Sequence, residues 1–362
     1  MSMTRSALSI LIAGLFAGCG GDSSTDHDDG GSGTTGGSDD GDLPFTSGAS
    51  TLAGTGEAGH VDGARKLARF SNPVNVAYRD GTLYVADFDN HKLRAIDVTT
   101  HVTSTVINQA GFARPFGLAF GPDGTLYVST DNNQAGNHDP MSGSIWKVDT
   151  AAHKATVVAS SIGRPRGMTV LPDGRLAVAD YLHHVIELVD VHTGKATTIA
   201  GAWDAKGMAD GPGAAARFSG PYCLVMRGDG KLVVTDFDNN RLRLVGLDGT
   251  TSTLSGGQAG FADGPLAAAQ YSHPQALSAA QSGDIYLTDL GNFRVRRISG
   301  GTVQTVAGDG KGGWADNDNP LAAEFYGLEG LSVVPDDSMV YVADGNRGDP
   351  VPFNRVRQVK LK

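Results

Sequence analysis

The sequence contains six copies of one pattern, and this repetition constrains the fold more than any other feature. Each copy has a proline-led apolar run, a turn, a second apolar run ending in Asp, and a third run that carries Arg or Lys. The clearest copies begin at residues 70, 218 and 271, and weaker ones begin near Ala113, Ile162 and Phe325. Repeats of about 20–50 residues are typical of solenoids, propellers and similar arrays.

The copy at 218 shows what one repeat must form. The run LVM is followed by the turn RGDGK, the β-branched run KLVVTD, a second turn, and RLRLV, which alternates with the period of a half-buried strand. A fourth segment, TSTLSGG, follows. Each unit is therefore expected to be a sheet of four short strands. Radial stacking of such sheets buries their faces, so the sequence predicts an all-β, six-bladed β-propeller.

The two ends of the repeat region are complementary. The last copy ends with the strand NRVRQVKLK at 354–362 and lacks a fourth strand, whereas TLAGTG at 51–56 precedes the first full copy and belongs to none. We expect this N-terminal strand to complete the last blade, within a propeller domain spanning 49–362. The pairing leaves no open edge between the first and last blades.

The repeat resembles the NHL-repeat β-propellers over about residues 50–362. The residues that carry the resemblance are the proline-led strand, the GTLYVAD and NHKLR segments, and a loop phrase G-x-x-DG…AARF found at 59, 207 and 260. Blades two and three lack that long loop. The resemblance implies a fold but no particular function, because propellers host many unrelated activities.

The N-terminal segment is expected to be a lipoprotein signal. Arg5 precedes an apolar run of about twelve residues, which is too short to span a bilayer. Residues 1–19 resemble a bacterial signal peptide ending at a lipobox, with Cys19 as the lipidated residue; ordinary secretion with cleavage nearby is the alternative. Residues 20–48, rich in Gly, Ser and Asp, predict a flexible tether. The expected location is the bacterial cell envelope, lipid-anchored and extracytoplasmic, and the outer membrane if the host is Gram-negative.

The charge of the chain argues against nucleic-acid binding. Seven acidic residues lie in the tether and Arg5 lies in the signal, which leaves 28 basic and 32 acidic residues in the propeller, a net charge of −4. A net negative charge of this kind provides no basic surface for binding nucleic acid. The membrane is expected to be contacted through the lipid anchor only. The second cysteine, Cys223, falls on an inner strand and is expected to be a small buried hydrophobe rather than a reactive thiol.

One ring of positions differs between all six blades and is the candidate ligand site. It is formed by the residue after each blade-starting proline, with Leu328 replacing the proline in the last blade. The ring comprises Val74, Phe116, Arg166, Tyr222, Gln275 and Glu329. A channel mouth with a cation, an anion, aromatic rings and an amide suits a polar small molecule or a peptide end. Alternatively, Arg166 and Glu329 only pair with each other, directly or through a bridging water, and close the pore.

Two long loops on the same face, 131–143 and 344–354, add His138 and Asp139 as possible ligand contacts. The blade-ending aspartates occur in every blade, so we interpret them as turn caps rather than catalytic groups. They are Asp87, Asp131, Asp180, Asp236, Asp289 and Asp344.

The sequence favours a binding module whose channel mouth and loops take a protein, peptide or glycan. It assigns no catalytic residue and no metal ligand. The alternative is a channel-metal hydrolase or lyase, because Glu329 at the start of the last blade loosely resembles the blade-start Glu of gluconolactonase-like enzymes. Their Asn-Asp-Gly phrase is missing, and Asn75 is the only partial substitute. No cofactor is assigned, and a calcium or zinc ion in the channel is left open.

Overall fold

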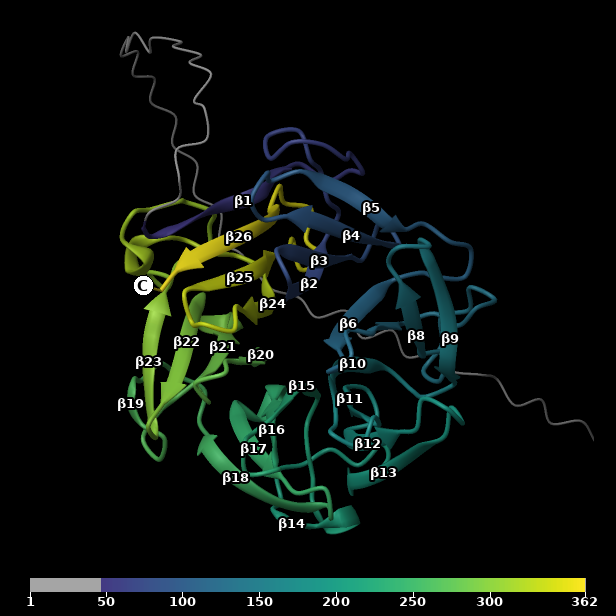
Figure 1. Cartoon of the computed structure of the whole chain (residues 1–362). Coiled ribbons are helices and arrows are strands. Elements are labelled where there is room, and N and C mark those ends of the chain that lie inside the picture. The colour runs from purple at the N-terminus through teal and green to yellow at the C-terminus, as the bar shows by residue number, and fades with distance from the viewer. Residues whose placement is uncertain (1–46, 362) are drawn as a thin grey trace, which may run out of the picture. The chain divides into compact units, whose positions relative to one another are not determined.

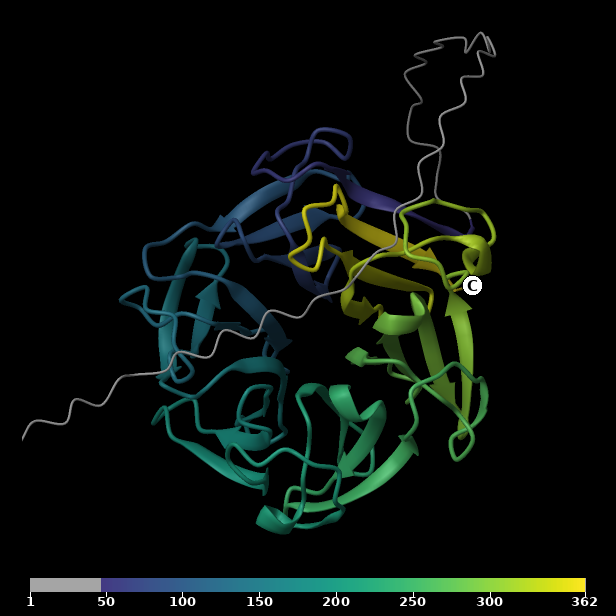
Figure 2. The ribbon, with the colours of Figure 1, turned by 180° about the vertical axis from the view of Figure 1, so that it is seen from behind.

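The computed structural model describes residues 47–361, and within them the chain forms six antiparallel sheets arranged as the blades of a propeller around a central channel (Figure 1; Figure 2 shows the opposite side). The predicted all-β, six-bladed architecture is confirmed. The predicted signal and Cys19 lie outside the described residues, as does nearly all of the tether. Within residues 47–361 no helix is long and apolar enough to cross a membrane.

Each blade has four main strands, which are named here in order outward from the channel. Blade 1 contains β2 (Pro73–Arg79), β3 (Thr82–Asp87), β4 (Lys92–Asp97) and β5 (Thr103–Ile107). Blade 2 contains β6 (Pro115–Phe120), β7 (Leu126–Thr130), β8 (Ser144–Asp149) and β9 (Lys154–Ser160). Blade 3 contains β10 (Pro165–Val170), β11 (Leu176–Asp180), β12 (Val185–Val189) and β13 (Ala196–Gly201).

The remaining blades follow the same order with small additions. Blade 4 contains β15 (Pro221–Met226), β16 (Leu232–Asp236), β17 (Arg241–Val245), β18 (Thr250–Gly256) and the short edge strand β14 (Gly211–Pro212). Blade 5 contains β20 (Pro274–Ala279), β21 (Ile285–Asp289), β22 (Arg294–Ser299), β23 (Thr302–Ala307) and the edge strand β19 (Gly264–Pro265). Blade 6 contains β24 (Leu328–Val333), β25 (Met339–Asp344), β26 (Asn354–Lys360) and β1 (Ala49–Gly56).

The predicted closure of the ring is confirmed. Strand β1 pairs antiparallel with β26, from Ala49 opposite Val359 to Gly56 opposite Asn354. Both strands lie at the outer side of blade 6, next to blade 1 (Figure 1). Leu52 and Ala53 of β1 are fully buried. The N-terminal strand therefore joins the first and last blades through backbone and side-chain contacts.

Apolar clusters fill the junctions between neighbouring blades, and among residues 47–361 there is one such cluster at each of the six junctions. The cluster between blades 6 and 1 combines Leu52 with Val85 and Val356. Packing is close at these junctions. A Cβ atom on Gly330 would lie 2.5 Å from the Asn75 Cα, so only glycine fits where blade 6 meets blade 1.

The blade-ending aspartates act as turn caps, as predicted, in five blades. The Asp87 carboxylate accepts a hydrogen bond from the Ser71 backbone N–H at 2.8 Å and another from Asn90 Nδ2 at 2.8 Å. Asp236 and Asp289 repeat this arrangement, and Asp180 and Asp344 also accept backbone N–H groups. Asp131 of blade 2 differs, because its carboxylate contacts two arginine side chains, Arg164 and Arg166.

Four blades also contain a buried arginine that joins two aspartates. In blade 4, Arg243 is fully buried and lies 2.7 Å from Asp236 and 2.7 Å from Asp210, which belongs to the long DG loop. Arg94, Arg296 and Arg357 form the same Asp–Arg–Asp bridge in blades 1, 5 and 6. The alternating pattern of RLRLV predicted a half-buried strand with Arg243 on its exposed face. The strand forms, but Arg243 is buried, because paired carboxylates satisfy its charge inside the protein.

Blades 2 and 3, which lack the DG loop, also lack this arginine. Trp146 takes its place in blade 2 and donates a hydrogen bond to Thr130 Oγ1 at 2.9 Å. Glu187 takes its place in blade 3, where burial and the neighbouring Asp180 charge raise its pKa to about 7. The DG loop and the buried arginine thus occur in the same blades, because the aspartate of the loop and the guanidinium neutralise each other.

Candidate functional site

The candidate site lies on the face of the ring that carries the loops after the blade-ending aspartates and the connections entering each blade; we call it the loop face. In blade 1, for example, the Asp89 backbone N–H donates to the Ser71 carbonyl at 3.1 Å. Every inner strand starts at this face and contains a β-bulge within its first four residues. A bulge re-aims side chains, and here it falls at the six ring positions.

Most of the predicted ring residues come together. Val74 and Phe116 share one apolar cluster, and Tyr222 packs against it. The Phe116 and Tyr222 rings are 5.6 Å apart at their centroids, although they come from blades 2 and 4. Gln275 is buried at the start of β20. We call these five residues the loop-face cluster: Phe116, Arg166, Tyr222, Gln275 and Glu329.

The guanidinium of Arg166 packs against two aromatic rings. Its guanidinium carbon lies 4.0 Å from the Phe116 ring centroid and 5.9 Å from that of Tyr181. Its ion pair is with Asp131, with 3.1 Å between Nη1 and Oδ1, rather than with Glu329 across the channel. The direct Arg166–Glu329 ion pair that the alternative included is therefore not formed. The Nη1 of Arg166 is thus engaged by Asp131, whereas its buried Nε finds no hydrogen-bond partner among the protein groups of residues 47–361.

Asp131 is the site residue that the sequence missed. It occupies the position of a turn cap, but its carboxylate lies between Arg166 and Arg164, at 3.4 Å from the Arg164 Nη1. Its side chain is almost fully buried. The signal that could have found it was the pair of arginines around Pro165, which no other blade has at these two positions.

Glu329 is buried on the opposite side of the channel, in blade 6. Burial raises its pKa to about 8, although the positive charges of Arg166 and Arg347 oppose the change. Its Oε1 atom has no hydrogen-bond partner among the protein groups of residues 47–361. At neutral pH Glu329 is therefore mainly protonated and has a hydrogen-bonding atom that the protein does not use.

The loops add further arginines to the same face. Arg114 lies 3.2 Å from the Nδ1 of His138, which is exposed in the 131–143 loop. Burial, together with the charges of Arg114 and Arg164, lowers the pKa of His138. Arg347 is exposed in the 344–354 loop. The sequence predicted one cation and one anion at this mouth of the channel. The structure adds three more arginines, Arg114, Arg164 and Arg347, to Arg166 on the same face.

The two predicted loop contacts differ in what they do. His138 belongs to the arginine group just described. Asp139 forms a local turn, in which its Oδ1 accepts the Met141 backbone N–H at 2.8 Å and its carbonyl accepts the Ser142 hydroxyl at 2.9 Å. Asp139 therefore shapes the loop.

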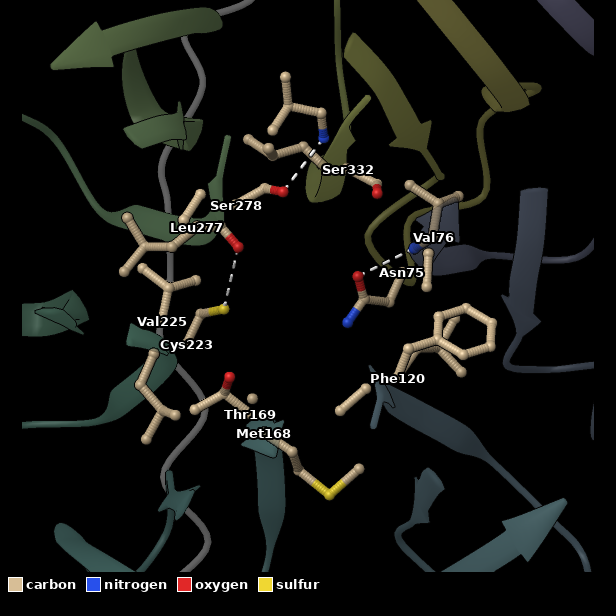
Figure 3. Close-up of a pocket in the computed structure, with 18 of the residues that line it drawn as sticks. Asn75, Val76, Phe120, Met168, Thr169, Cys223, Val225, Leu277, Ser278 and Ser332 are labelled. Atoms are coloured by element: carbon tan, nitrogen blue, oxygen red, sulfur yellow. Dashed lines mark hydrogen bonds between the residues drawn. The ribbon is translucent and has the colours of Figure 1, made fainter. Parts of the chain in front are cut away.

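A cavity lies in the channel beyond the ring, between the ends of the inner strands farther from the loop face. It measures about 320 Å³ and is lined by the later residues of the inner strands. Figure 3 shows Asn75, Cys223 and Ser278 around it, with Met168 and Phe120. The predicted site lies at the other end of the channel, and this cavity was not predicted from the sequence.

The polar groups of the cavity are largely engaged within the sheets. The Ser332 hydroxyl accepts the Tyr78 backbone N–H at 3.0 Å, and the Ser278 hydroxyl accepts that of Val333 at 3.1 Å. Cys223 was predicted to be a small buried hydrophobe; it is half-buried, packs against the apolar cluster between blades 4 and 5, and lines the cavity. Burial raises the pKa of its thiol to about 11, which keeps it protonated and weakly nucleophilic.

The residues of the channel do not fit the metal of a gluconolactonase-like enzyme. Glu329 belongs to the loop-face cluster, whereas Asn75 lines the cavity and its Oδ1 accepts the Val76 backbone N–H at 2.9 Å. The cavity lining contains no carboxylate or imidazole. Nowhere in residues 47–361 do three or more His, Cys, Asp or Glu side chains lie close enough to hold a metal ion.

No protein-family model matches the chain. It is 25% identical over 314 residues to the NHL repeat-containing protein 2 of Gallus gallus, covering 80% of this chain and 40% of that protein. The chain is an NHL-repeat-like six-bladed β-propeller. This propeller is also 28% identical over 287 residues to the chloroplastic protein SUPPRESSOR OF QUENCHING 1 of Arabidopsis thaliana, covering 68% of this chain and 27% of that protein.

Among solved structures, the propeller is similar to an auxiliary nutrient binding protein from Bacteroides thetaiotaomicron. The TM-score is 0.66 at 17% sequence identity, and the match covers 86% of this chain and 75% of the other. At this identity the similarity establishes the fold alone. The propeller spans less than half the length of the curated relatives that it matches.

Proposed function

We propose that this protein is a lipid-anchored binding protein of the bacterial cell envelope, whose propeller takes a small polar ligand, or the end of a longer chain, at the loop-face cluster. The observation that carries the proposal is the meeting of Arg166 and Glu329 with aromatic rings at the channel mouth, where the Nε of Arg166 and the Oε1 of Glu329 are buried without a hydrogen-bond partner among residues 47–361. Buried polar atoms are almost always paired, so unpaired ones at a channel mouth favour a ligand. The cavity beyond the ring offers fewer such groups.

Binding is a better explanation of this cluster than catalysis. No nucleophile lies next to a base within it, and burial raises the pKa of its one acidic group, Glu329, to about 8. The similarity to an auxiliary nutrient binding protein agrees with a binding role on this fold, although it does not identify a ligand.

Replacing Arg166 tests the location of the site. Arg166→Gln removes the charge and the stacked fork, and we expect affinity for the bound ligand to fall about 10–100-fold, as for a lost hydrogen bond to a charged group. Asp131 keeps Arg164 as its partner, so the fold should persist. Binding is measured by calorimetry with ligands selected from a library of sugars, amino acids, sugar acids and short peptides.

The matched control is Arg175→Gln, which breaks an exposed Arg–Asp pair in the turn between β10 and β11, on the opposite face. Equal affinities for the Arg166→Gln and Arg175→Gln proteins would place the ligand elsewhere and refute the proposed site.

The anchor is tested separately in cells. Cys19→Ala should move the protein from the membrane fraction to the soluble extracytoplasmic fraction and abolish labelling by a fatty-acid probe, because Cys19 is the proposed lipidation site. Unchanged labelling of the Cys19→Ala protein would contradict the anchor and leave the ligand site unaffected.

A further inference from the structure

We infer that the group held at the loop-face cluster is a carboxylate, carried by a small molecule such as a sugar acid or by the C-terminus of a short peptide. This inference rests on the proposed function and adds the ligand's chemical class. Its starting point is the guanidinium of Arg166, whose carbon lies 4.0 Å from the Phe116 ring centroid, whose Nη1 contacts Asp131, and whose buried Nε has no hydrogen-bond partner among residues 47–361. The edge of a guanidinium formed by Nε and Nη2, which Asp131 leaves free, matches a carboxylate in two-point geometry.

The charge around the cluster has the sign that this ligand needs. Arg114, Arg164 and Arg166 act together on His138, and Asp131 opposes them. Arg347 approaches from the 344–354 loop. The propeller as a whole is predicted to be net acidic, so a concentration of four arginines at one channel mouth is a local excess that attracts an anion.

Glu329 does not oppose a bound anion at neutral pH. It is 9% exposed, and because its carboxyl is mainly protonated it can donate a hydrogen bond to a ligand oxygen. The charged or titratable groups that face it are Arg166 on β10, Arg347 in the β25–β26 loop, Asp89 in the β3–β4 loop and Tyr222 on β15. Burial raises the pKa of Tyr222 further above its ordinary value of 10, so its phenol stays neutral between pH 7 and 9.

Matched ligand pairs test the inference on the full-length protein. The probes are galacturonate against galactose, and N-acetylalanine against N-acetylalaninamide, so that each pair differs chiefly in one carboxylate. We expect the acid of at least one pair to bind at least about tenfold more tightly than its neutral partner, and Arg166→Gln to remove this preference. The two pairs also distinguish a sugar acid from a peptide terminus.

The pH dependence supplies a second readout. Ionisation of Glu329 above about pH 8 places a negative charge beside the bound carboxylate, so affinity for the acid should fall as the pH rises from about 7 to about 9. Glu329→Gln, which imitates the protonated side chain, should bind the acid at neutral pH and lose this fall. A fall of equal size in the Glu329→Gln protein would overturn the role of Glu329.

The outcomes separate this inference from the proposed function. If neutral or cationic compounds bind and Arg166→Gln weakens them, the site is correct and the carboxylate class is wrong. If the acids bind with an affinity that Arg166→Gln leaves unchanged, both are wrong. If neither acid binds in calorimetry while another library compound binds through Arg166, the carboxylate class is again overturned; if no compound depends on Arg166, both proposals fail.

Discussion

Deleting residues 49–56 should remove most of the stability of the propeller. The deletion takes away β1, and with it the fully buried side chains of Leu52 and Ala53 and the pairing with β26. Loss of a buried Leu side chain alone costs about 2–5 kcal/mol, which is a large part of the 5–15 kcal/mol typical of a whole domain. The exposed edge of β26 would also be free to pair with other chains.

Circular dichroism during heating measures the melting temperature of the deleted chain, and sedimentation velocity measures its aggregation. We expect a much lower melting temperature, with aggregation of the deleted chain. Glu57→Ala is the control, because Glu57 follows the same strand but is exposed and only pairs with exposed Arg69. A deleted chain that melts like the Glu57→Ala protein would show that β1 does not close the ring in solution.

Replacing the buried arginine of blade 4 is expected to have the second large effect. Arg243→Leu leaves Asp236 buried without its cation and removes hydrogen bonds to the Ala209 and Arg217 carbonyls, both at 2.8 Å. Breaking a buried ion pair by removing one partner costs about 3–5 kcal/mol. The DG loop around Asp210 should also lose its attachment to the blade.

Chemical denaturation of Arg243→Leu and Arg175→Leu makes the comparison. Arg175 pairs with Asp173 at the surface, and an exposed pair contributes about 0–1 kcal/mol. The double variant Asp236→Asn, Arg243→Leu should recover part of the loss, because it removes the uncompensated charge. Similar losses in the two single variants would mean that the buried bridge contributes no more than a surface pair.

The sequence was sufficient for the architecture because the fold depends on local patterns repeated six times. Strand lengths, turns and the missing fourth strand of the last blade can each be recognised within one copy. The burial of Arg243 could not be recognised in this way. Its partner Asp210 lies 33 residues earlier, in a loop whose path is set only when the blade has formed.

The candidate site was predicted in part for the same reason. Alignment of the repeats placed Arg166, Tyr222 and Glu329 on one ring, because equivalent positions occupy equivalent places. The same alignment misled for Asp131, which looks like its five counterparts but faces Arg164 and Arg166. A residue that keeps its type and changes its neighbours is invisible to a comparison of repeats.

The pairing of β1 with β26 also has a consequence for the order of synthesis. Asn354 and Gly56 meet across almost the entire length of the chain. A ribosome therefore produces β1 long before its partner exists, and contacts this distant in sequence form late and slowly. Until the final strand emerges, the nascent chain carries an unpaired apolar segment that must be kept from associating elsewhere.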